Sequence, residues 1–145
     1  MIKKTIKYTD YNGTERTEDF WFNLNTRELA NLELKSEGGF EGMIRQMMAT
    51  TDIPKLTDLF EKIVLASYGE ISPDGKRFIK KDGELAKEFI ETEAYVQLYL
   101  ELISDANKLS AFINGIVPKD IAQNMNSDEA KKKIEELKKE YHIEQ

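Results

Sequence analysis

The sequence predicts a mainly α-helical fold, in which an N-terminal β-hairpin packs on a bundle of about five to six helices and a charged C-terminal helix follows. Apolar residues alternate with polar ones over 1–24, as in strands, and recur at helical spacing over 25–118. The last 19 residues carry one narrow apolar stripe among charges. We predict a single globular domain over 1–118, a linker over 119–126 and a C-terminal helix over 127–145 whose order before partner binding stays open.

The hairpin prediction depends on strand periodicity and on the Asn12-Gly13 pair, because both of these residue types tolerate the positive φ of tight turns. The returning strand is expected over 17–24, with Trp21 facing away from its aromatic neighbours. A two-stranded hairpin is marginal alone, so its apolar face must pack on helices or on another subunit. The residues expected on that face are Ile2, Lys4, Ile6 and Tyr8 on the first strand and Phe20, Phe22 and Leu24 on the second.

The first two helices have clear boundaries. Asn25 and Glu28 form a capping-box pattern, and Gly38-Gly39 ends the first helix. The second helix is expected over 40–50. Its apolar stripe consists of Phe40, Met43, Ile44, Met47 and Met48.

Proline, glycine and threonine mark the expected ends of the remaining helices. Pro54 suits the first turn of a third helix, which Gly69 would end in the left-handed conformation. A loop over 70–82 should follow, and then a short helix beginning at Glu84. Thr92 caps the next helical stretch, and Pro118 ends the last one. The apolar stripes of 95–117 and 56–64 should form the core.

The amino-acid composition excludes several classes of function. Acidic residues outnumber basic ones 27 to 21, and the net charge of −6 argues against binding to nucleic acid or to an anionic membrane. The chain has no cysteine, which excludes disulfides and thiolate metal sites. No apolar run is long enough to span a bilayer, and the N-terminus lacks the apolar block of a signal peptide.

No catalytic or cofactor site is recognisable, so we expect neither enzyme activity nor a cofactor. The single histidine, His142, has no partner that would make a zinc pair or a triad. Glu84 and Glu88 would share a helix face, as a metal site requires, but they lie among lysines, as on a solvated face.

The candidate residues are therefore those of protein–protein contacts. Trp21 is either the far side of a sandwich or an exposed anchor. The methionines Met43, Met47 and Met48 form either an adaptable partner surface or plain core. The C-terminal helix offers a short coiled-coil seam with Ile134, Leu137 and Tyr141.

Several segments, taken together and in order over roughly residues 2–118, resemble the tail assembly chaperones of long-tailed, siphovirus-type phages and prophages of Gram-positive bacteria. No single segment is a catalytic signature. The segments are Glu18-Asp19-Phe20-Trp21-Phe22-Asn23-Leu24, the helix over 29–34 with Glu37-Gly38-Gly39, Ser67-Tyr68-Gly69-Glu70, Ser72-Pro73-Asp74-Gly75-Lys76-Arg77-Phe78, Thr92-Glu93-Ala94-Tyr95 and Ala111-Phe112-Ile113-Asn114-Gly115-Ile116-Val117-Pro118.

The resemblance implies a non-enzymatic protein of the host cell cytoplasm that is absent from the mature virion. Such chaperones bind the tape measure protein, keep it soluble and help recruit tail tube subunits. The resemblance also implies self-association into homo-oligomers and a longer, frameshifted form of the same protein. The run Lys131-Lys132-Lys133 is compatible with a slippery coding stretch and equally with a solvated helix. The alternatives are a small regulatory or anti-host binding protein, a structural tail component and, least favoured, a metal-dependent enzyme using Glu84 and Glu88.

Overall fold

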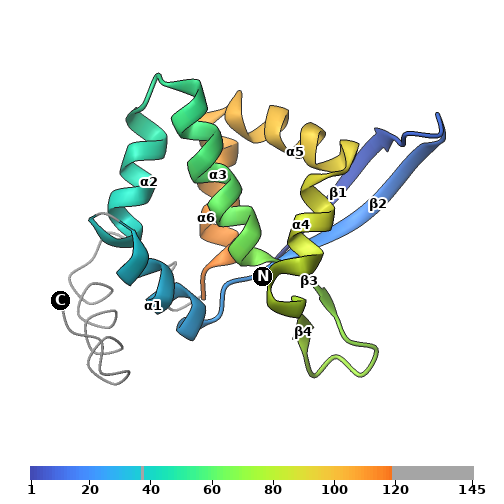
Figure 1. The fold of residues 1–145 in the computed structure, drawn as a ribbon, viewed down its shortest axis with the longest axis horizontal. Helices are drawn as coiled ribbons and strands as arrows, with labels where there is room; N and C mark the ends of the chain where they lie inside the picture. The colour runs from blue at the N-terminus through green and yellow to red at the C-terminus, as the bar shows by residue number, and fades with distance from the viewer. Residues whose placement is uncertain (37, 119–145) are drawn as a thin grey trace.

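The computed structural model describes residues 1–36 and 38–118, which form six α-helices, one short 3-10 helix and a four-stranded antiparallel sheet of order β1-β2-β3-β4 (Figure 1). The predicted linker and C-terminal helix lie outside these residues. The elements are β1 (Ile2–Thr9), β2 (Glu15–Phe22), α1 (Thr26–Lys35), α2 (Gly39–Ala49), α3 (Ile53–Ser67), β3 (Tyr68–Ile71), β4 (Phe78–Ile79), η1 (Lys81–Gly83), α4 (Glu84–Ile90), α5 (Glu93–Ile103) and α6 (Ala106–Ile116).

The N-terminal hairpin is confirmed, and Ile2 lies opposite Phe22 as the two-residue alternation requires. Its second strand begins and ends two residues earlier than predicted. The turn differs as well: residues 10–14 join the strands, and only Gly13 of the Asn12-Gly13 pair has a positive φ, of 82°. The tip of the hairpin extends beyond the helices (Figure 1).

The prediction of a mainly α fold is wrong in one respect, because the hairpin continues into a larger sheet. The segment expected to be a glycine-capped helix end and a loop contains β3 and β4. Trp21 pairs with Gly69, and Glu70 pairs with Ile79. The described part of the chain is therefore mixed α and β.

Gly69 does not end α3 in the left-handed conformation, because it lies in β3 without a positive φ. A Cβ atom there would lie 2.6 Å from Cε2 of Phe78 and 2.7 Å from the carbonyl oxygen of Ile79. Glycine is required at this position because the next strand approaches so closely.

The helix boundaries largely follow the predicted caps. Asn25 and Glu28 form the capping box of α1, Thr92 caps α5, and the proline after Ile53 lies in the first turn of α3. The Asp105 side chain caps α6 by accepting from two backbone N–H groups. None of the described helices is long and apolar enough to cross a membrane.

The core lies where α3, α5 and α6 meet the inner face of the hairpin, as the apolar stripes predicted. Phe22, Phe60, Phe112 and Ile113 are each at most 1% exposed. The rings of Phe22 and Phe112 meet edge to face with centroids 5.1 Å apart. The segment after β2 is fixed between two helix ends, because Asn23 N donates to Ser67 O and Leu24 N donates to Ile116 O.

Candidate functional site

A groove of about 820 Å³ lies beside α1, and we call it the basic groove. It is bounded by the segment before α1, by α1, α2 and α3, and by the chain from β4 to η1. Its volume falls in the range of binding clefts in proteins. The residues lining it are Asn23, Asn25, Arg27, Glu28, Asn31, Leu32, Lys35, Ser36, Met43, Lys62, Leu65, Ala66, Phe78, Lys80, Lys81, Asp82 and Gly83.

One wall of the basic groove is a row of side chains on α1. Arg27, Asn31 and Lys35 follow one another at four-residue spacing, so they lie on the same face of the helix. Arg27 and Lys35 are exposed and form no ion pair within residues 1–36 and 38–118. The two cations are about 12 Å apart along the helix axis.

The rest of the lining combines further cations with apolar side chains. Lys62 on α3 and Lys81 on η1 are exposed at the rim. Met43 of α2 also lines the groove, with only 2% of its surface exposed. The other apolar lining residues are the half-buried Leu32, Leu65, Ala66 and Phe78, and we call these four and Met43 the apolar floor.

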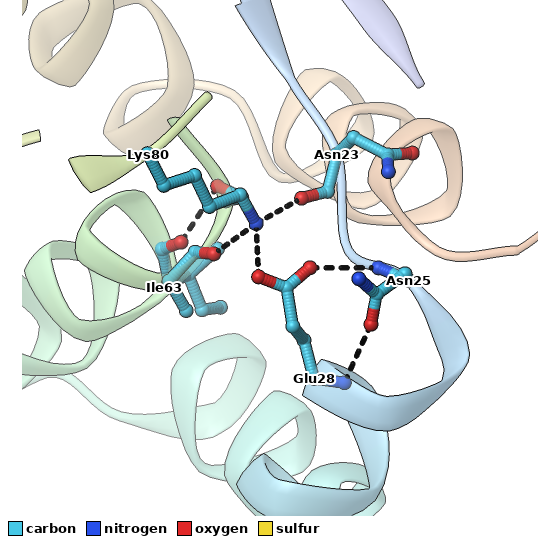
Figure 2. Close-up of polar contacts among 7 residues, drawn as sticks. Asn23, Asn25, Glu28, Ile63 and Lys80 are labelled. Atoms are coloured by element: carbon cyan, nitrogen blue, oxygen red, sulfur yellow. Dashed lines mark hydrogen bonds and ion pairs between the residues drawn. The ribbon is translucent and has the colours of Figure 1, made fainter. Parts of the chain in front are cut away.

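Lys80 joins the parts of the chain that form the groove (Figure 2). Its ammonium donates to the carboxylate of Glu28 at 2.6 Å and to the carbonyl oxygens of Asn23 at 2.8 Å and Ala66 at 2.7 Å. Its side chain is 15% exposed. The other carboxylate oxygen of Glu28 accepts from Asn25 N at 3.0 Å. One carboxylate therefore caps α1 and neutralises the cation that links α1 to α3 and β4.

Burial lowers the pKa of the Lys80 ammonium below 10.5, although the hydrogen bond and charge of Glu28 act in the opposite direction. The positive charge of Arg27 lowers this pKa further. The direction of the shift shows that desolvation outweighs the attraction of the carboxylate. Lys80 is thus a structural cation whose charge is already committed within the fold.

A side chain on α1 caps the start of α2. Glu33 on α1 accepts from Phe40 N, the first free donor of α2, at 2.6 Å. Gly39 must be glycine there, because its φ is 76° and a Cβ atom would overlap the Glu33 carboxylate. This contact holds the start of α2 against α1 beside the groove.

Trp21 lies outside the basic groove, on a smaller hollow of about 390 Å³ between β2 and β3, which we call the β2–β3 hollow. It is partly exposed on the face of the hairpin opposite to Phe20 and Phe22. The hollow forms because β3 pairs with β2 over two residues and then turns to β4. It is lined by Glu18, Asp19, Phe20, Trp21, Tyr68, Glu70 and Ile71.

The three methionines proposed as a partner surface lie in different surroundings. Met43 and Met47 are each 2% exposed and belong to the core, whereas Met48 is 39% exposed near the end of α2. Of the three, Met43 lines the basic groove. A role of any of them in binding stays a prediction. Ile134, Leu137 and Tyr141 lie outside the described residues.

The basic groove was not predicted from the sequence. The row Arg27, Asn31 and Lys35 could have been found, because helical spacing alone places these residues on one face. Lys80 had no such signal, since it lies 52 residues after Glu28 and 14 after Ala66. Only the tertiary structure brings these groups together.

The groups that line the basic groove suit binding to another protein. Glu84 and Glu88 are both exposed, and in residues 1–36 and 38–118 no group of three His, Cys, Asp or Glu side chains could hold a metal ion. The basic groove offers cations, carbonyl groups and an apolar floor. Such a lining suits a peptide or a helix of another protein.

Comparison with known proteins gives a family match. A family model described as "Phage tail assembly chaperone" matches residues 1–145. None of the curated proteins and none of the solved structures compared with the chain matches it.

Proposed function

The chain belongs to the phage tail assembly chaperone family, and from this premise we propose that it binds the tape measure protein, keeps it soluble and helps recruit tail tube subunits around it. The observation that carries the proposal is the family match over all 145 residues. Membership in a chaperone family implies protein partners in tail assembly and suggests a role without catalysis.

The basic groove supports the proposal, because it offers a place for a helix of another protein. A tape measure protein must expose apolar helical stripes before the tail tube encloses it. A groove with an apolar floor and a polar rim accepts one face of such a helix. A turn of helix with its side chains occupies about 500 Å³, so the volume of the groove corresponds to between one and two turns of helix.

We further propose where and in what form the protein acts. The setting is the cytoplasm of a Gram-positive host during assembly of a long, siphovirus-type tail, and the protein is absent from the mature virion. We expect the chain to form homo-oligomers and its gene to encode a longer, frameshifted form as well.

Co-expression with the tape measure protein tests the proposal. We expect the tape measure protein to be insoluble alone and to co-purify with this chain as a complex of defined mass by light scattering. An equally acidic, unrelated protein of similar size is the control for unspecific solubilisation. If the tape measure protein stays insoluble or elutes alone, the proposed partner is wrong.

Purified virions provide a second test, which separates a chaperone from a structural tail component. A chaperone is expected to be missing from them, whereas a tail component would be present at fixed stoichiometry. Recovery of a single host protein from a lysate, with no tail protein, would instead favour the anti-host alternative.

A further inference from the structure

We infer that the basic groove binds an amphipathic α-helix whose apolar stripe is flanked by acidic side chains. The inference rests on the proposed function, because it names the chemistry of the segment that the chaperone holds. The juxtaposition that carries it is one groove lined by the row Arg27, Asn31 and Lys35 on α1, by Lys62 and Lys81 and by apolar side chains.

Charge is the first argument. The whole chain carries −6, yet the groove is lined by five basic side chains and only two acidic ones, Glu28 and Asp82. The ion pair between Glu28 and Lys80 cancels one charge of each sign within the fold. Four cations then face one carboxylate, so the groove is a positive region on a negative molecule. A bound segment with acidic side chains is attracted here and repelled elsewhere.

Spacing is the second argument. Arg27 and Lys35 lie two helical turns apart on the same face of α1. A helix lying along α1 repeats its own side chains at the same interval, so acidic residues two turns apart can meet both cations. Asn31 between them donates and accepts hydrogen bonds and tolerates any polar side chain opposite.

The lining of the groove favours a helix over a β-strand or a nucleic acid as the bound partner. The strand that lines the groove, β4, is two residues long, which is too short for a partner strand to add to its edge. A nucleic acid would place phosphates beside Leu32, Leu65 and Met43, where they would lose hydration without a partner. It would also approach a molecule of net charge −6. The apolar stripe of a helix can pack on the apolar lining residues, and its acidic flanks can pair with the basic ones.

The test uses the full chain and two helical peptides of about 20 residues, which share one leucine stripe and carry either glutamate or lysine on both flanks. We expect calorimetry to show binding of the glutamate peptide, weakening as salt is added, and at least about tenfold weaker binding of the lysine peptide. Equal affinities, or no binding of the glutamate peptide, would overturn the inference. A bound single-stranded oligonucleotide that competes with the glutamate peptide would do the same.

Charge reversal on α1 locates the binding. We expect Arg27→Glu combined with Lys35→Glu to weaken binding of the glutamate peptide at least about tenfold and to strengthen binding of the lysine peptide. The matched control is Lys108→Glu combined with Lys87→Glu, which changes net charge equally. Both control residues are exposed and lie outside the groove. Lys108 lies in the first turn of α6, as Arg27 does in α1, and Lys87 lies in the last turn of α4, as Lys35 does in α1. Equal effects of the two double variants would place the contact elsewhere.

The two proposals fail in different ways. If the unaltered chain retains the tape measure protein but does not distinguish the peptides, the groove chemistry is wrong and the proposed function stands. If the peptides behave as expected and the tape measure protein does not co-purify, the groove chemistry stands and its partner is another protein.

Discussion

Two tyrosines one turn apart on α5, Tyr95 and Tyr99, have hydroxyl groups in different surroundings, so removing each hydroxyl should change the free energy of unfolding differently. The Tyr99 hydroxyl lies 2.7 Å from the Thr57 hydroxyl on α3. The Tyr95 hydroxyl is buried and has no hydrogen-bond partner within residues 1–36 and 38–118. A buried polar group without a partner costs about 1–3 kcal/mol.

We therefore expect opposite results from the same chemical change. Tyr95→Phe should leave the free energy of unfolding unchanged or raise it by about 1 kcal/mol, whereas Tyr99→Phe should lower it by about 1 kcal/mol. Urea denaturation of both variants measures this, and each serves as the control for the other. Equal losses would mean that the Tyr95 hydroxyl has a partner in solution.

Lys80 is a polar residue on which the stability of the fold depends, because it donates to three acceptors from separate segments. Lys80→Met keeps the length of the side chain but leaves the Glu28 carboxylate and two carbonyl groups without their donor. We expect a loss of about 2–3 kcal/mol in the free energy of unfolding by urea denaturation. Lys62→Met, an exposed change on α3, should stay within about 0.5 kcal/mol. Comparable losses in the two variants would contradict the structural role of Lys80.

Among the elements, β3 and β4 were the ones that could not be predicted. Strands of four and two residues are too short for apolar alternation to appear, and Gly69 resembled a helix cap. The turn between them was visible: Gly75 N donates to Ser72 O as expected of Ser72-Pro73-Asp74-Gly75. What the sequence could not show was that β2 offered an edge on which so short a hairpin could pair.

Gly69→Ala tests how firmly this small hairpin is held. The added methyl group would meet the Phe78 ring and the Ile79 carbonyl oxygen, and a backbone atom cannot rotate away. We expect a loss of about 2 kcal/mol in the free energy of unfolding. Pro73→Ala, in the exposed turn of the same hairpin, should cost less than about 1 kcal/mol and is the control. A fully stable Gly69→Ala variant would show that β4 is free to move away.

The helices were largely predictable because each is fixed by local signals. The capping box of Asn25 and Glu28, the proline at the start of α3 and the Thr92 cap all act within about one helical turn. Their apolar stripes also predicted the core correctly. The basic groove combines five segments of the chain, so only its α1 wall could be predicted from local sequence.

At the scale of the whole molecule, buried phenols make the fold sensitive to alkali. Burial, and for Tyr8 also the hydrogen bond to Glu18, raises the pKa of Tyr8, Tyr68 and Tyr95 from 10.0 to about 12. Between these two values the unfolded chain has already lost phenolic protons that the folded chain keeps. The stabilisation from these groups is therefore complete below pH 10 and is lost as the pH passes about 12.

We expect the free energy of unfolding to fall between pH 10 and about 12, measured by urea denaturation across this range. Tyrosinate absorbance should show at least these three of the six tyrosines ionising late in the folded chain, and all six near pH 10 in guanidinium. Lys80 acts in the opposite direction, since its lowered pKa makes stability rise with pH up to 10.5. Ionisation of every tyrosine near pH 10 in the folded protein would contradict the raised pKa values of these three phenols.

The position of Lys80 in the chain also determines when the basic groove can exist during synthesis. Residues 23–36 supply its first wall, but the cation that joins them to α3 comes 52 residues after Glu28 and 57 after Asn23. A nascent chain emerges N-terminus first. The ribosome therefore releases the α1 wall long before the groove can form. A partner helix made nearby meets a complete groove only on chains translated past residue 83.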